Sequence, residues 1–234
     1  MMETRNTYGS PTASLALSQY MSKVYMWMTI GILLTGFVSW SVASNPDMMY
    51  ALVSNRFAFY GLMIAEVGLV IWLSAGINKM SPLTATAMFL LYAALNGVTL
   101  SVFSMIYTSE SIQAAFFTTT FAFGGLSAFG YITKKDLGPV GNFCTMGLFG
   151  MLGFALISFF FPSMMGGMAG QIYGLVGLLV FAGLTAYDTQ VIKNMAPSGS
   201  GDHVARASIM GALKLYLDFI NLFLFILRMQ GRRK

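Results

Sequence analysis

Charged residues are scarce in this sequence: Asp, Glu, Lys and Arg make up 9% of its 234 residues, whereas 56% are hydrophobic. A soluble domain of this length needs a far more polar surface, so the composition excludes a soluble globular protein and predicts a membrane protein. The 13 bases and 8 acids fall mostly between the apolar runs, where the bases would lie beside anionic lipid head groups. We therefore expect the lipid bilayer as a partner and no nucleic acid.

Cysteine and histidine are nearly absent, with one of each. Cys144 lies within an apolar run, so the chain has no intrachain disulfide or Cys-based metal cluster, and we interpret Cys144 as a small packing residue. His203 lies in the polar stretch PSGSGDHVAR, so no buried base is available for a serine intramembrane protease. The methionines of FPSMMGGMAG have no Cys or His beside them, which disfavours a Cu(I) site. We predict no cofactor and no firm metal site.

Long apolar runs are abundant. A helix needs about 20 apolar residues to cross about 30 Å of hydrocarbon, and only helices satisfy the backbone of such segments in lipid. Seven runs approach or exceed this length: 24–44, 57–77, 83–107, 112–132, 140–161, 171–191 and 209–229. The sequence predicts an all-α integral membrane protein with one seven-helix domain over 24–234. A polar tail over 1–23 precedes it, without the short apolar core of a cleavable signal.

Basic residues favour one side of the predicted bundle. With seven crossings, the amino-terminal side carries Arg5, Lys23, Lys79, Lys134, Lys135, Lys193 and Arg206, and the opposite turns carry Arg56. Because cytoplasmic loops carry an excess of Lys and Arg, we expect a cytoplasmic N-terminus. The basic end over 228–234 would then lie outside, a conflict that an additional re-entrant carboxyl-terminal segment would remove.

Three acids lie inside the apolar runs. Asp188 is in LVFAGLTAYDTQ, Asp218 in LKLYLDFINLFLF and Glu66 in GLMIAEVGLVIWL. A carboxylate at membrane depth is costly, so such residues face a protein interior or a water-filled path. Two interpretations of Glu66 stay open: a neutral carboxyl bonded to a neighbouring helix, or a group that relays protons or contacts cations. Asn96 is neutral and predicts an interhelical hydrogen bond.

The last run has a polar face. Lys214, Asp218 and Asn221 follow one another at spacings of four and three, so they share one side of a helix, which must point inward. Lys214 could form a structural ion pair with Asp218. Asp188 lies near the end of the preceding run, and the last run re-enters from the same side. We therefore expect Asp188 and Asp218 in the same leaflet on adjacent antiparallel helices.

Two carboxylates a few ångströms apart in a low dielectric cannot both ionise easily, so such a pair titrates as a unit. A pair that holds one proton can join two helices by a hydrogen bond. A pair that holds none repels, or captures a cation, and carboxylate oxygens suit hard cations such as Ca²⁺. We predict a transient cation contact at Asp188, Asp218 and Glu66.

The runs GALKLYLDFINLFLFILR, FAGLTAYDTQVIKNM and AEVGLVIWLSAGI resemble the Bax inhibitor-1, or transmembrane Bax inhibitor motif, family. The resemblance extends from about Leu17 to the end of the chain and is strongest to bacterial inner-membrane members. It implies six helices around a central seventh and a pH-sensitive leak for Ca²⁺ controlled by an aspartate pair. By motif position the pair corresponds to Asp188 and Asp218, and a pore-lining acid to Glu66. We add Asn96 and Asn221 as candidate pore-lining residues.

The chain departs from this family at the basic partner of the pair. A calcium-leak member latches its aspartates with an arginine near the end of the second span, where this chain has Ile77, with Lys79 two residues on. Conversely, Lys214 stands where relatives carry a small hydroxyl residue. Our hypothesis is that Lys214 replaces the arginine and stabilises the ionised pair.

Two other functions remain open. Some bacterial family members act as modulators of a membrane-bound ATP-dependent protease, which would grip the polar tail of this chain. Paired aspartates also occur in intramembrane aspartic proteases, where they activate water. The GxGD pattern of those enzymes is absent here, because Leu-Tyr-Leu precedes Asp218, and no PAL motif follows it. We therefore expect no enzyme activity.

Overall fold

Helices account for nearly all of the described chain. The computed structural model describes residues 11–197 and 201–234. Its α-helices are α1 (Pro11–Ala43), α2 (Pro46–Ser54), α3 (Arg56–Gly76), α4 (Pro82–Leu100), α5 (Phe103–Ile106), α6 (Ser109–Ile132), α7 (Gly138–Phe160), α8 (Gly167–Asn194) and α9 (Asp202–Gln230). Two short 3₁₀ helices, η2 (Ile77–Lys79) and η3 (Pro162–Met165), follow α3 and α7. Seven helices, all except α2 and α5, are long and apolar enough to cross a membrane. The predicted all-α membrane protein with seven spanning helices is confirmed.

Side-chain caps set where the spanning helices begin. Ser81 Oγ accepts the backbone N–H of Thr84 at 3.1 Å, and Pro82 occupies the start of α4. Asn55 Oδ1 accepts the backbone N–H of Ala58 at 3.1 Å at the start of α3. Both arrangements satisfy donors that a helix leaves unpaired at its first turn. The spanning helices are therefore joined by short polar turns at the two ends of the bundle.

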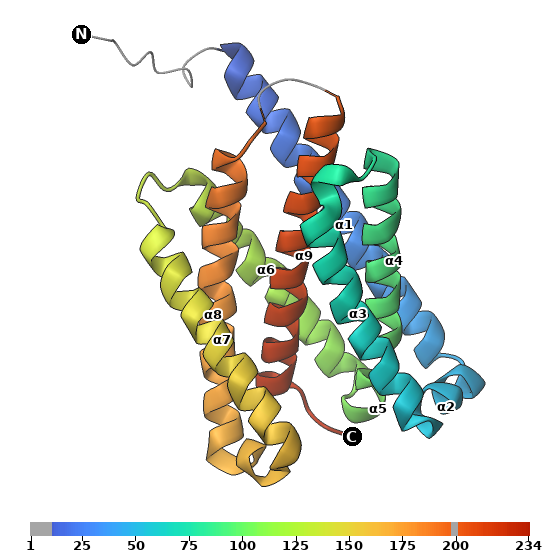
Figure 1. Ribbon diagram of the computed structural model, residues 1–234. Coiled ribbons are helices and arrows are strands. Elements are labelled where there is room, and N and C mark those ends of the chain that lie inside the picture. The colour runs from blue at the N-terminus through green and yellow to red at the C-terminus, as the bar shows by residue number, and fades with distance from the viewer. Residues whose placement is uncertain (1–10, 198–200) are drawn as a thin grey trace.

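The last helix is the central one (Figure 1). Helices α1, α4, α6 and α8 pack directly against α9, whereas α3 packs on α4 and α7 packs on α8. The other six spanning helices therefore surround α9 in two layers. This position explains why α9 holds the densest set of buried residues in the described chain.

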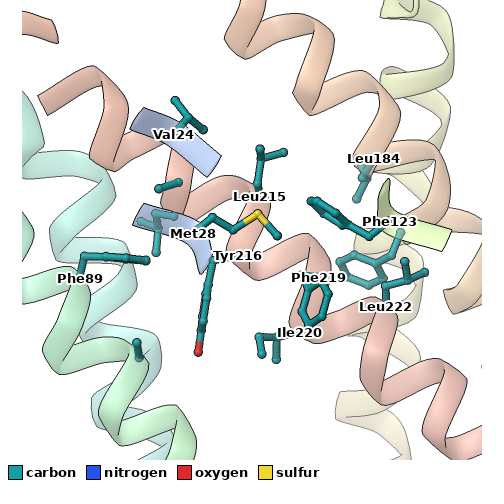
Figure 2. Close-up of a cluster of buried hydrophobic side chains, with 14 of the residues drawn as sticks. Val24, Met28, Phe89, Phe123, Leu184, Leu215, Tyr216, Phe219, Ile220 and Leu222 are labelled. Carbon is teal, nitrogen blue, oxygen red and sulfur yellow. The ribbon is translucent and has the colours of Figure 1, made fainter. Parts of the chain in front are cut away.

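Aromatic side chains fill the space on both flanks of α9 (Figure 2). Tyr216 is fully buried, and its ring lies edge-on to Phe89 of α4, with 5.7 Å between the ring centroids. Phe219 lies on another flank, edge-on to Phe123 of α6 at 5.6 Å. Buried aromatic pairs of this geometry stabilise a fold beyond the area that they bury. The orientation of α9 about its own axis is thus fixed by large side chains on two sides.

Small residues allow the outer helices to approach closely. A Cβ atom on Gly97 of α4 would lie 2.6 Å from the carbonyl oxygen of Thr35 in α1. In the same way, Cys144 of α7 is buried with its Sγ against Gly183 of α8. Close backbone packing of this kind drives helix association in lipid, and Cys144 is the packing residue that its sequence context indicated.

The start of α1 and the end of α9 lie at opposite ends of the bundle (Figure 1), as seven crossings require. The last residues do not turn back into the bundle: the backbone N–H of Thr108 donates to the carbonyl of Arg232 at 3.1 Å, and that of Lys234 donates to the carbonyl of Ile106 at 3.0 Å. They dock on the connection between α5 and α6. Over the described residues, α9 runs unbroken from Asp202 to Gln230, so the alternative of a re-entrant carboxyl-terminal segment is not observed there.

The first helix begins earlier than its apolar run indicated. We expected a polar tail over 1–23, but α1 begins at Pro11, and of that tail only residues 1–10 lie outside the described residues. Tyr20 and Met21 are buried, and the Tyr20 hydroxyl donates to the carbonyl of Ala207 in α9 at 3.4 Å. A helix that packs one apolar face on protein needs no continuous apolar run. The expected boundary at residue 24 was therefore too late.

Candidate functional site

The helices α8 and α9 are joined inside the bundle by an ion pair. Lys214 Nζ of α9 lies 3.1 Å from Asp188 Oδ1 of α8. The Lys214 side chain is 38% exposed and that of Asp188 is 13% exposed. The pair thus links two spanning helices, and Asp188 is more buried than Lys214.

Lys214 does not form the ion pair with Asp218 that the sequence suggested. The spacing of four placed Lys214 beside Asp218, but the ammonium group pairs with Asp188. Side chains on a helix lean toward its N-terminus, so Lys214 leans away from Asp218. Asp188 lies near the end of α8, at the same end of the bundle as the start of α9, and is therefore within reach.

Asp218 is more deeply buried than Asp188 or Lys214. Asp218 is 4% exposed, and its Oδ2 has no hydrogen-bond partner within the described chain. The charges of Asp188 and Lys214 both act on it. One helical turn, about 6 Å, separates Asp218 from Lys214 along α9. We refer to Asp188, Lys214 and Asp218 as the di-aspartate site.

The charge balance of the di-aspartate site is uneven. Two aspartates share one lysine, so full ionisation leaves one negative charge without a partner. A charge in this position is costly, because burial removes water and Lys214 is already committed to Asp188. A single proton or a single monovalent cation restores neutrality, and Ca²⁺ reverses the net charge from −1 to +1, so the site can respond to protons and to cations.

Asn221 lies on the same side of α9 as Lys214, two helical turns further along. Its Nδ2 donates to the carbonyl of Leu217 in α9 at 2.8 Å. Its amide is thus bonded within its own helix. Asn221 extends the polar side of α9 beyond Asp218.

Glu66 belongs to a second polar cluster. Thr99 Oγ1 donates to Glu66 Oε1, and Asn96 Nδ2 donates to Glu66 Oε2 at 3.4 Å. Glu66 is on α3 and its two donors are on α4, so these bonds join the two helices. The interhelical hydrogen bond expected for Asn96 is present. Thr99 was missed from the sequence, although its spacing of three from Asn96 puts it on the same side of α4.

The two clusters lie on different flanks of α9. Tyr216 and Asp218 are two residues apart, about 200° around the helix. Tyr216 faces α4 and α1, where its hydroxyl lies 2.7 Å from Thr35 Oγ1. Asp218 interacts instead with Asp188 of α8. The structure therefore brings Asp188, Lys214 and Asp218 together but leaves Glu66 and Asn96 on the other side of Tyr216.

No basic side chain occupies the position expected for the family's arginine. Ile77 lies in η2 and is buried, and Lys79 at the end of η2 is exposed. Neither forms a described ion pair with Asp188 or Asp218. Among the described residues, the base that contacts an aspartate of the site is Lys214.

Sequence comparison agrees with the fold. The family model described as "Inhibitor of apoptosis-promoting Bax1" matches residues 17–234. The inner membrane protein YbhL of Escherichia coli (strain K12) is 45% identical over 223 residues, which cover 93% of both chains. An uncharacterized protein of Borreliella burgdorferi is 40% identical over 222 residues, 94% of each chain. The uncharacterized protein RP147 of Rickettsia prowazekii is 38% identical over 229 residues, 97% of this chain and 95% of the other.

Proposed function

The chain belongs to the Bax inhibitor family of multi-pass inner-membrane proteins, and we propose that it is a pH-sensitive leak for Ca²⁺ or another cation. In this proposal Asp188 and Asp218 form the sensor and gate, and Lys214 is their basic partner. The observation that carries the proposal is the ion pair between Lys214 and Asp188, next to a buried Asp218 that has an unpartnered oxygen.

The ion pair acts as the latch. While Asp188 is ionised, its attraction to Lys214 holds α8 against α9 and keeps the path closed. When the pH falls and Asp188 takes up a proton, this attraction is lost and the two helices can separate. The described contacts thus favour an ion pair as the latch over the hydrogen bond between two aspartates that the sequence suggested. Cation flux should therefore rise as the pH falls.

A cation crossing the gate needs oxygen ligands. Asp218 supplies an unpartnered carboxylate oxygen at the inner end of the site, and carboxylates are suitable ligands for Ca²⁺. Glu66, Asn96 and Asn221 remain our candidates for the pore lining. Of these, Asn221 is continuous with the di-aspartate site, whereas a path that includes Glu66 and Asn96 must pass Tyr216.

The leak is tested by reconstitution in liposomes that contain a calcium dye, at external pH values from 5 to 8. Wild type should admit Ca²⁺ with a single pH midpoint. Asp188→Asn removes the charge that Lys214 holds, so its flux should be high and independent of pH. Asp218→Asn should lower the flux, because the neutral amide cannot carry the negative charge that attracts the cation. Identical traces for all three proteins would refute the proposal.

We propose that the amino-terminal end of the bundle faces the cytoplasm. The turns and helix ends on this side contain Lys79, Lys134, Lys135 and Lys193, and basic residues beside the spans favour the cytoplasmic side. The di-aspartate site lies nearer to this end. The variant Lys134→Cys should consequently be protected from a membrane-impermeant maleimide in intact cells and labelled after lysis.

The alternative functions gain less support. Regulation of a membrane protease rested on the tail, whose residues 1–10 lie outside the described residues. An aspartic protease needs two carboxylates that share a proton and activate water, whereas Asp188 is paired with Lys214. We therefore retain the leak as the proposed function.

A further inference from the structure

A long groove runs between α1 and α6. It encloses about 630 Å³, within the range of about 300–1,000 Å³ that is usual for ligand sites. Its walls are one side of each helix, from Ser18 to Leu33 on α1 and from Phe116 to Ile132 on α6, and Phe219 of α9 contributes to its floor. The α1 wall alone is about 22 Å long.

The groove opens toward the lipid and is not filled by the described chain. Both walls belong to membrane-spanning helices, and their rims are exposed: Leu33 is 63% exposed and Ile132 is 73% exposed. The Tyr25 hydroxyl bridges the two walls through Ser127 Oγ at 2.6 Å. Because hydrocarbon surrounds these helices, an extended apolar chain is the natural occupant of most of the groove.

One end of the groove is polar and basic. Because α1 and α6 are antiparallel, Ser18 and Ser22 lie at the same end as Tyr131. Lys193 Nζ donates to the carbonyl of Tyr131 at 2.7 Å and lies 5.2 Å from the centre of its ring. Tyrosine at a membrane interface marks the level of the head groups. The groove therefore combines an apolar length with a cationic end.

The lysines that follow α6 are held in place beside this end. Gln190 of α8 donates through Nε2 to the carbonyl of Lys135 at 2.8 Å, and its Oε1 accepts the backbone N–H of Leu137 at 2.9 Å. Both Lys134 and Lys135 are exposed. The turn after α6 thus presents its positive charges from a fixed backbone.

We propose that this groove binds one anionic phospholipid, with an acyl chain lying between α1 and α6 and the phosphate beside Lys134, Lys135 and Lys193. The apolar groove and the basic end fit the two parts of such a lipid, and basic pockets between spanning helices are suited to anionic head groups. The proposal does not depend on the leak, because none of these residues belongs to the di-aspartate site.

Two neighbouring glycines provide a matched test. A Cβ atom on Gly124 or on Gly125 would meet nothing within 4 Å, so both positions have room for a larger residue, but only Gly124 lines the groove. Gly124→Leu should fill the groove, and Gly125→Leu should not. Each protein is incorporated into nanodiscs of equal parts phosphatidylglycerol and phosphatidylcholine, and retained lipids are counted by native mass spectrometry.

Wild type and Gly125→Leu should retain one phosphatidylglycerol, and Gly124→Leu should retain at least fivefold less. Equal retention by the two leucine variants would overturn the groove as the site. A wild-type dimer that holds no lipid and that Gly124→Leu dissociates would also overturn the proposal, in favour of a second copy of the chain as occupant.

The head group is tested separately with charge. In a double variant, Lys134→Gln with Lys135→Gln, the preference for phosphatidylglycerol over phosphatidylcholine should fall at least threefold, while the protein still retains a lipid. Lys79→Gln removes a base at the same end of the bundle, away from the groove, and should keep the preference. A preference that survives the double variant would overturn the proposed position of the phosphate.

Discussion

Lys214 should hold the proposed leak closed at neutral pH, and Lys214→Met removes its charge while keeping a long side chain. The ammonium group lies 3.1 Å from Asp188 and also acts on Asp218. Removing this cation removes the ion pair that forms the latch, so α8 and α9 are no longer held together by it at any pH. Ca²⁺ flux at pH 7–8 is therefore expected to rise toward that of Asp188→Asn and to lose most of its dependence on pH.

The size of the effect follows from the geometry. An ion pair across a few ångströms is worth about 1–3 pH units of carboxylate titration, or about 1.4–4 kcal/mol. The Lys214 side chain is 38% exposed, and water weakens such a pair, so the lower end of this range applies. We expect the ratio of closed to open protein at neutral pH to fall about tenfold, which corresponds to about 1.4 kcal/mol.

The assay is the liposome flux measured at closely spaced pH values from 5 to 8. Lys214→Arg keeps the positive charge and should retain a midpoint close to that of wild type. Combining Lys214→Met with Asp188→Asn should add little to Asp188→Asn alone, because the latch is already absent. A wild-type pH profile in Lys214→Met, or an equal rise of the flux in Lys214→Arg, would refute the role of the charge.

Three further predictions concern the contacts around α9 and the outer helices. Thr99→Val leaves Glu66 without its closest donor, and the free energy of unfolding, measured by denaturation in detergent, should fall by about 1–3 kcal/mol. Gly130→Ala brings a Cβ onto the carbonyl of Ala186 in α8, so a thermal unfolding scan should show a loss of at least about 2 kcal/mol, whereas an unchanged midpoint would mean that α6 can move. Tyr216→Phe removes one hydroxyl and should cost about 1 kcal/mol without changing the pH midpoint of the flux, since Tyr216 lies on the other flank from the di-aspartate site.

The length of apolar runs was enough to predict the seven spanning helices, because crossing hydrocarbon imposes length and composition directly. It failed at the start of α1, where Tyr20 and Met21 are buried against protein. Packing on α9 replaces lipid there, so polar residues are tolerated on the other sides of the helix. A sequence window measures only the average polarity of a segment and cannot detect that replacement.

Only part of the candidate site could be predicted from the sequence. Helical spacing placed Lys214, Asp218 and Asn221 on one side of α9, but spacing within one helix gives no direction toward its neighbours. The pairing of Lys214 with Asp188 depends on where α8 ends and on which way the lysine leans. The separation of Glu66 from the aspartates depends on the rotation of α9, which is fixed by distant aromatic contacts.

The position of Tyr216 bears on how the two polar clusters can act together. Tyr216 and Asp218 belong to one rigid helix and point to different flanks, so rotation of α9 that opens the interface with α8 also moves the Tyr216 ring. That ring is packed edge-on against Phe89 of α4. In the proposed leak, release of the latch must therefore work against this ring packing. Protonation alone removes one ion pair, and the aromatic packing on the opposite flank determines how far α9 can then turn.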